Sequence, residues 1–135
     1  MDIFKDIKIL VGTRKISYFT YRPFKNEIIN FLSLLSKNIL TNRNAKKFTD
    51  ILTFAFFCRE KNLTSLSKKY SNLDLRMGLG LSFHITPSNI PTNFAYSLVF
   101  GLLSGNSNII RVPSKNFPQV KIICNEINKV LIKFP

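Results

Sequence analysis

Cysteine, histidine and tryptophan are nearly absent from this chain of 135 residues. It has two cysteines, Cys58 and Cys124, a single histidine, His84, and no tryptophan. Two cysteines in helical surroundings provide neither a disulfide framework nor the spacing of a metal-binding pair. We therefore expect no metal site and a reduced, cytoplasmic environment.

Long apolar runs are also lacking. The longest, residues 94–103, is far shorter than the roughly 20 residues that a helix needs to span a bilayer. The first ten residues mix charged and apolar side chains and lack the apolar centre of a signal peptide. The sequence thus predicts no membrane span.

Acidic residues are few, with seven against 20 lysines and arginines, which gives a net charge of +13. Such a charge is typical of nucleic-acid-binding domains. However, the basic residues are spread along the chain, with small groups only at residues 43–47 and 68–69 and no known binding motif around them. We expect a solvated basic surface and no specific nucleic-acid binding, which stays the third interpretation.

Apolar residues are plentiful, at 45% of the chain, which is enough for a folded core. Residues 1–75 are expected to form a mainly helical region. The pattern predicts helices over residues 27–40, from a cap at Thr49 and Asp50, and near residues 63–70, with a short strand region at residues 16–19. The apolar positions that define the first two helices are Ile28, Leu32, Leu35 and Ile39, and Ile51, Leu52, Ala55 and Phe56.

Residues 76–135 alternate between strand and helix. An apolar strand over residues 80–86, expected to be buried on both faces, precedes an apolar helix over residues 93–104. Gly105 suits the position after that helix where positive φ is common, and a second strand comes next at residues 108–112. This order predicts an α/β fold with a parallel strand–helix–strand unit. Asn116 and Pro118 suit the start of a last helix, whose apolar face comprises Val120, Ile123, Cys124, Ile127, Val130, Leu131 and Phe134.

Two parallel strands cannot complete a sheet of this kind. Each strand would lack neighbours, and the apolar faces would stay partly exposed. We therefore expect the chain to be the N-terminal piece of a longer enzyme. Its exposed sheet edge is also a surface through which an oligomer or a partner chain can bind.

A polar turn comes after the first strand at residues 87–91, with the sequence Pro-Ser-Asn-Ile-Pro. Parallel α/β sheets bind their ligands at the carboxyl ends of the strands. The sequence therefore predicts that the chemistry of this chain lies around this turn.

Three strings carry a family resemblance: residues 84–91 (HITPSNIP), Gly105-Asn106, and residues 111–114 (RVPS). In order and spacing they resemble the acyl-CoA reductases of the LuxC type, a branch of the aldehyde dehydrogenase superfamily, most closely over residues 76–115. The resemblance implies an aldehyde-dehydrogenase-like fold, in which a helical part precedes the first β-α-β-α of a Rossmann-type cofactor domain, incomplete here. It also implies that the catalytic cysteine, the catalytic glutamate and the glycine-rich cofactor segment lie beyond residue 135.

The resemblance implies a catalytic role for Asn89. This residue matches the asparagine whose amide donates to the oxyanion formed during thioester reduction, and its alternative role is to cap or bridge the turn. Neither cysteine is expected to be the nucleophile, because Cys124 lies on an apolar helix face and Cys58 lies away from the turn. His84 is expected to be a structural residue of the strand.

The resemblance also implies a set of cofactor-binding residues. Ile85, Thr86 and Pro87 match positions that line the cofactor cleft, and the alternative is that they merely end the strand. Ser114 and Lys115 match positions beneath the adenosine ribose, where Lys115 replaces the family's acidic residue. A lysine there favours NADP over NAD, and ordinary surface solvation is the alternative. Arg111, beside them, would support the same preference.

The leading interpretation is the N-terminal part of an NADPH-dependent reductase that converts acyl-CoA or acyl-protein thioesters into fatty aldehydes, inactive alone. The alternative is a non-catalytic, truncated module that binds a partner protein through its sheet edge. The two interpretations differ in the sequence expected after Pro135.

Overall fold

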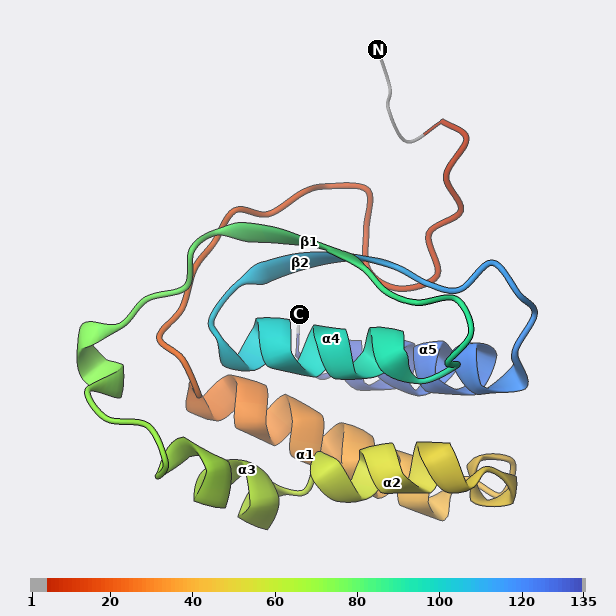
Figure 1. Cartoon of the computed structure of the whole chain (residues 1–135), viewed down its shortest axis with the longest axis horizontal. Helices are drawn as coiled ribbons and strands as arrows, with labels where there is room; N and C mark the ends of the chain where they lie inside the picture. The colour runs from red at the N-terminus through yellow and green to blue at the C-terminus, as the bar shows by residue number, and fades with distance from the viewer. Residues whose placement is uncertain (1–4, 135) are drawn as a thin grey trace.

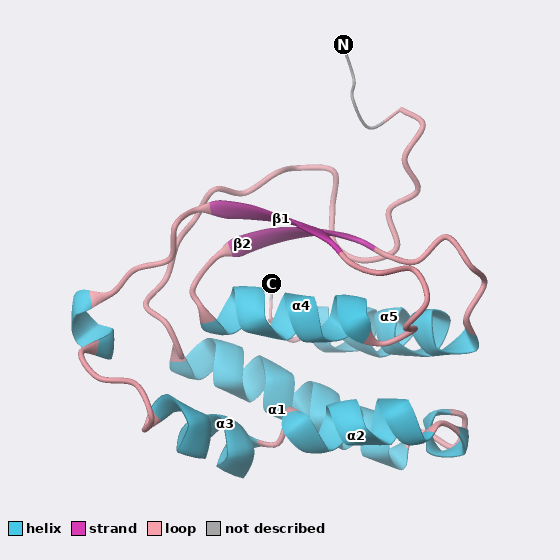
Figure 2. Ribbon diagram, in the orientation of Figure 1, coloured by secondary structure: helices cyan, strands magenta, loops and turns pink. Residues whose placement is uncertain are grey.

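Five α-helices and one parallel pair of strands make up residues 5–134, which are the residues that this computed structural model describes (Figure 1). The strands lie on one side of the molecule, α4 and α5 lie next to them, and α1, α2 and α3 lie beyond (Figure 2). The elements follow in the order α1 (Asn26–Thr41), the 3-10 turn η1 (Ala45–Lys47), α2 (Thr49–Phe57), α3 (Glu60–Ser67), the 3-10 turn η2 (Leu73–Leu75), β1 (Leu81–Ile85), α4 (Asn93–Leu103), β2 (Ser107–Arg111) and α5 (Pro118–Leu131).

The two strands pair in parallel, with α4 as the connection between them. Leu81 lies opposite Ser107 at one end of the register, and Ile85 lies opposite Arg111 at the other. α4 packs against β2 on one side and against α1 on the other, so it joins the sheet to the helical part. The predicted strand–helix–strand unit and the α/β class are confirmed, with strand boundaries within one residue of those expected.

One hydrophobic core joins the helices on both sides of the boundary expected after residue 75. α1 buries Leu32, Leu35 and Ile39 completely, as its periodicity predicts. The Ser36 hydroxyl donates to the carbonyl oxygen of Ala55 at 2.6 Å, which ties α1 to α2 inside this core. The division of the chain into two regions stays a prediction. The core also includes Ile51, Phe54, Leu63, Phe94, Val99, Val120, Ile123, Cys124, Ile127 and Val130.

Residues 16–19 do not form the predicted strand. They belong to an irregular segment, residues 5–25, that passes the sheet on the side away from the helices (Figure 1). The Ser107 hydroxyl donates to the carbonyl oxygen of Phe19 at 2.8 Å, which ties this segment to the start of β2. Without a backbone partner along its length, a short apolar alternation does not become a strand.

The core-facing side of α2 differs from the prediction at one aromatic position. Ile51 and Ala55 are buried as expected, and Phe54 is buried with them. Phe56 is exposed instead, and its ring centre lies 4.1 Å from the guanidinium carbon of Arg59. A cation–π contact of this kind stabilises an aromatic ring at the surface.

The helix starts were predicted better than the residues that cap them. α5 begins with Pro118 as its first residue, as expected, but Phe117 rather than Asn116 precedes it as the cap. Phe48 likewise takes the cap position of α2 in place of residues 49–50. Neither cap makes a side-chain hydrogen bond, whereas Asp50 Oδ1 accepts from the Ile51 amide at 2.9 Å inside the first turn of α2.

β1 is not buried on both faces, which corrects the prediction for this strand. Phe83 and Ile85 are 64% and 69% exposed, because only the face toward α4 is covered. Within residues 5–134, neither strand has a second neighbour in the sheet. The exposed apolar face and the two open edges are what the sequence predicts for an incomplete sheet.

Three chain segments meet at Tyr21, Gly78 and Gly105, which we call the glycine junction. Gly105 comes after α4 with φ of +83°, as predicted for the position after a helix. The Tyr21 amide donates to the Gly105 carbonyl at 2.9 Å, and the Gly78 amide donates to the Tyr21 carbonyl at 2.9 Å. A side chain on Gly105 would collide with the Tyr21 backbone. The junction therefore fixes the amino ends of both strands to the irregular segment.

Candidate functional site

The carboxyl ends of β1 and β2 form one continuous edge, which we call the carboxyl edge (residues 85–91 and 111–115). Ile85 is in register with Arg111. The next residue, Thr86, donates its hydroxyl to the carbonyl oxygen of Arg111 at 3.2 Å. The two loops that the sequence marks as functional therefore start side by side, although they are separated along the chain by α4.

Asn89 lies in the turn between β1 and α4, with its side chain exposed. This side chain makes no hydrogen bond to any residue of the described chain. The backbone holds the turn instead, since the Asn93 amide donates to the Ile90 carbonyl at 3.4 Å, and Thr92 is the cap residue of α4. The Asn89 amide thus keeps both of its N–H donors available, and its oxyanion role stays a prediction.

The five expected cofactor-binding residues divide between the two loops of the carboxyl edge. Ile85 and Pro87 are exposed and Thr86 is half-buried. Ser114 and Lys115 are both exposed in the bend after β2. None of these side chains hydrogen-bonds to another of them within residues 5–134. The structure brings the two loops together and leaves the polar groups of Ser114 and Lys115 exposed to solvent.

His84 has a structural partner, in agreement with its interpretation as a residue of the strand. Its Nε2 lies 2.9 Å from Oδ1 of Asn108 on β2. The same Asn108 side chain donates from Nδ2 to the Asn106 carbonyl at 2.8 Å and packs against Gly101 of α4. Because Nδ2 of Asn108 donates to Asn106, Oδ1 is the atom that faces His84. An amide oxygen can only accept, so Nε2 of His84 carries a proton and donates it to this oxygen.

Both cysteines are free, buried thiols. Burial raises the pKa of the Cys58 thiol to about 12 and that of Cys124 to about 11. Both thiols therefore stay protonated near neutral pH, whereas a nucleophilic cysteine needs the thiolate. Both side chains are buried in the helical core, away from the carboxyl edge.

Metal ligands do not gather in the part of the chain that the structure describes. There, no three His, Cys, Asp or Glu side chains come together as a metal site. Over the same residues, no helix combines the length and the apolar character needed to cross a bilayer.

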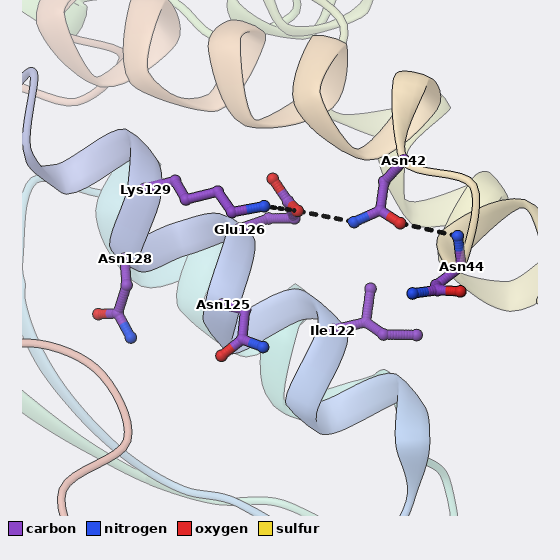
Figure 3. A pocket seen from close by; sticks show the side chains of 7 residues that line it. All are labelled: Asn42, Asn44, Ile122, Asn125, Glu126, Asn128 and Lys129. Atoms are coloured by element: carbon purple, nitrogen blue, oxygen red, sulfur yellow. Dashed lines mark hydrogen bonds and ion pairs between the residues drawn. The ribbon is translucent and has the colours of Figure 1, made fainter.

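A polar hollow between the end of α1 and the middle of α5 was not predicted (Figure 3). It has a volume of about 370 Å³ and is lined mostly by asparagines, together with Glu126 and Lys129. Glu126 is only 3% exposed, and its Oε1 accepts from Asn42 Nδ2 and from Lys129 Nζ, each at 2.7 Å. The signal in the sequence was a glutamate within the apolar stripe of the last helix, between Ile123 and Ile127.

The contacts of Glu126 give it a structural role. Asn42, directly after α1, accepts at Oδ1 from the amides of Asn44 at 2.8 Å and Ala45 at 3.2 Å. Its Nδ2 then donates to Glu126. The carboxylate therefore links the turn after α1 to α5, and the hollow lies over this link.

We expect Glu126→Ala to lower the free energy of unfolding by about 2 kcal/mol, because the Asn42 amide is left without its buried partner. Urea unfolding followed by circular dichroism measures the change. Lys129→Met is the control, since this lysine is exposed and should contribute about 0.5 kcal/mol or less. Equal losses in the two variants would contradict the role given to the Asn42 link.

Comparison with known proteins yields one family. The family described as Acyl-CoA reductase (LuxC) matches residues 20–131. No curated protein and no solved structure matches the chain. The family match includes every residue of the carboxyl edge, and it extends over the helical region as far back as the glycine junction. Because it covers most of the sequence, the chain belongs to the LuxC family of acyl-CoA reductases.

Proposed function

We propose that this chain is the N-terminal part of an NADPH-dependent reductase that converts a long-chain acyl thioester into a fatty aldehyde, and that it is inactive alone. Family membership supports the reductase relation. The observation that carries the proposal is the register of the strands, which puts the turn with Asn89 and the bend with Lys115 at one sheet edge. Ligands of parallel α/β sheets bind at such an edge. An aldehyde-dehydrogenase-like Rossmann domain would extend this sheet on both sides.

Asn89 is proposed to stabilise the negative oxygen that forms when the thioester carbonyl becomes tetrahedral. An amide N–H suits this task because it donates a hydrogen bond without titrating. The exposed position of Asn89, and the absence of any hydrogen bond from its side chain to a described residue, leave that donor free to meet a substrate. The turn backbone, held at Ile90 and Asn93, would keep the amide in place.

The second loop of the carboxyl edge suits an anionic dinucleotide. Ser114 and Lys115 are exposed, and Arg111 lies at the end of β2 shortly before them. No aspartate or glutamate occurs anywhere in residues 75–125, so no carboxylate of this segment opposes a phosphate. Bound NADPH would supply the hydride for the reduction. In this proposal Lys115 pairs with its 2′-phosphate, and the Ser114 hydroxyl donates a hydrogen bond to it.

A chimera tests this function. In it, residues 1–135 replace the corresponding segment of an active family member, and thioester-dependent oxidation of NADPH is measured. We expect an active chimera, whereas the chain alone should show no activity because both of its thiols are buried and protonated. Activity of the chain alone that is lost in Cys58→Ser or Cys124→Ser would contradict the proposal. An inactive chimera that folds as the parent enzyme does would also contradict it.

Lys115→Glu in the same chimera is expected to lower kcat/KM for NADPH relative to NADH by about tenfold, because an ion pair is replaced by repulsion. Steady-state kinetics with both cofactors gives the ratio. Lys121→Glu makes the same charge change on an exposed position of α5 and is the control. If the two variants shifted the ratio equally, Lys115 would act only through the overall charge of the surface.

A second candidate function is a non-catalytic module that binds a partner through the sheet. The exposed Phe83 and Ile85 side chains favour it. Activity of the chimera separates the two candidates, since a binding module has no reason to retain a working carboxyl edge.

A further inference from the structure

β1 and β2 are held in the fold by different means, although each leads into one loop of the carboxyl edge. The half-buried positions of β1 are polar, Ser82 and His84, and no residue of this strand belongs to the hydrophobic core. β2 differs, because Ile110 and, directly after the strand, Val112 pack against the core. Apolar packing therefore anchors β2, whereas β1 depends on its backbone pairing and on polar contacts.

The two ends of β1 are also tied to β2 by different groups. At the amino end, the glycine junction holds the chain, and the Ser107 amide donates to the Gly80 carbonyl at 3.0 Å. Toward the carboxyl end, within residues 5–134, the side chains that tie this part of the chain to β2 are those of His84 and Thr86. Of the two, His84 lies inside the strand, shortly before the turn that carries Asn89.

Asn108 offers His84 an acceptor that is held in one orientation. Its Nδ2 donates to the Asn106 carbonyl at 2.8 Å, and its Oδ1 lies 2.9 Å from Nε2 of His84. The Asn108 side chain also fills space that a glycine of α4 leaves free, since a Cβ on Gly101 would collide with it. Asn108 thus sits between β2 and α4, and a residue that bonds to it is fixed against both.

We propose that His84 is a positioning residue of the reductase site. Through Asn108 it fixes the carboxyl half of β1 against β2 and α4, and thereby the turn from which Asn89 meets the thioester oxygen. Such placement matters for rate, because a displacement of about 1 Å can cost about a hundredfold. The inference rests on the proposed function, since it needs the oxyanion role of Asn89.

The same geometry predicts that catalysis and cofactor binding respond differently to the loss of His84. Asn89 follows β1, which depends on the His84 contact, whereas Lys115 follows β2, which the core anchors. Removing the contact should therefore displace the oxyanion donor and leave the cofactor loop in place. A change that merely destabilised the protein would not distinguish the two loops.

Three substitutions in the chimera separate the hydrogen bond from the rest of the side chain. His84→Leu removes the donor, and should lower kcat about tenfold while the Kd for NADPH changes by less than about twofold. His84→Gln places an amide N–H near the position of Nε2, and should keep kcat within about threefold of the unsubstituted chimera. His84→Asn carries the same amide on a shorter side chain that does not reach Asn108, so it should behave like His84→Leu.

A double variant shows whether His84 acts through Asn89. If the histidine positions this amide, His84→Leu should cost less than about twofold in kcat once Asn89 is already alanine, because no donor is left to position. A general structural effect would instead lower kcat about tenfold in both backgrounds.

Hydrogen exchange of the 135-residue chain, followed by mass spectrometry, tests the structural part of the proposal without any activity. His84→Leu should speed exchange about tenfold in residues 84–91, because the carboxyl half of β1 opens more often. Exchange around Ser107 should stay unchanged, since the glycine junction holds the amino ends of the strands.

Four results would overturn the proposal. The first three are equal exchange of residues 84–91 in the parent chain and His84→Leu, a kcat of His84→Gln no better than that of His84→Leu, and equal losses from His84→Leu with and without Asn89. The fourth is an active chimera that is indifferent to His84→Leu, which would overturn this inference alone. A folded but inactive chimera would overturn the proposed function, and this inference with it.

Discussion

Replacing Asn89 with alanine is expected to lower kcat of the chimeric reductase by about a hundredfold or more, with little change in cofactor affinity. The oxygen of the thioester gains its negative charge only as the reaction proceeds. A donor aimed at that oxygen therefore acts on the transition state more than on the bound substrate. Asn89 has an exposed amide that makes no hydrogen bond to a described residue, so its removal changes this donor and little else in the turn.

Ser88→Ala is the matched control for this experiment. Ser88 is exposed in the same turn and lies next to Asn89 in the chain, but no catalytic role is proposed for it. Single-turnover kinetics with saturating NADPH separates the reductive step from cofactor binding. A change in KM alone, or an equal loss in both variants, would make Asn89 a structural residue of the turn.

Gly105→Ala is expected to lower the free energy of unfolding by about 3 kcal/mol. Two effects combine at this position. An L-residue at φ of +83° is strained, and the added methyl group collides with the backbone of Tyr21 in the glycine junction. The hydrogen bond from the Tyr21 amide to Gly105 cannot keep its present geometry if the chains move apart.

The control separates the two effects, because Gly12 has nearly the same φ of +82° but nothing within 4 Å of an added methyl group. Gly12→Ala should therefore show the conformational strain alone, about 1 kcal/mol. Urea unfolding of the two variants and the parent chain gives both values. If Gly105→Ala lowered the free energy of unfolding no more than Gly12→Ala does, the glycine junction would accommodate the added methyl group without loss of stability.

The parts of the fold that the sequence predicts well are those set by local periodicity. The apolar faces of α1 and α5 repeat every three to four residues, and Leu32, Ile39, Ile123 and Val130 are buried as that spacing requires. Gly105 is predicted correctly for a similar reason, since its positive φ depends on the end of one helix. Each of these features depends on a few neighbouring residues.

Features that depend on distant partners are predicted less well. The short apolar segment at residues 16–19 has the alternation of a strand, but within residues 5–134 no strand pairs with it. Glu126 is buried against Asn42, which lies far away in the sequence. Composition cannot show such pairings, because they form only when the helices pack.

The candidate site also has one feature that follows from the sequence and others that do not. That the loops after β1 and β2 lie side by side is a consequence of parallel pairing and is confirmed by the Thr86 contact with Arg111. The roles of Asn89, Ser114 and Lys115 come from the family resemblance, because exposed polar side chains do not reveal their ligand. They stay predictions that the chimera tests.

The parallel pairing of β1 and β2 also bears on the order in which the elements of the chain fold. Leu81 can lie opposite Ser107 only after the whole of α4 has folded back. The chain must therefore close a long loop, at a cost in conformational entropy, before the strands gain their hydrogen bonds. α1 and α2 are neighbours in the sequence and can pack early around Leu35 and Phe54. Local opening reverses that order, since the sheet has few buried contacts and two solvated edges. We therefore expect the strands to pair after α1 and α2 have packed, and to open before that helical pair separates.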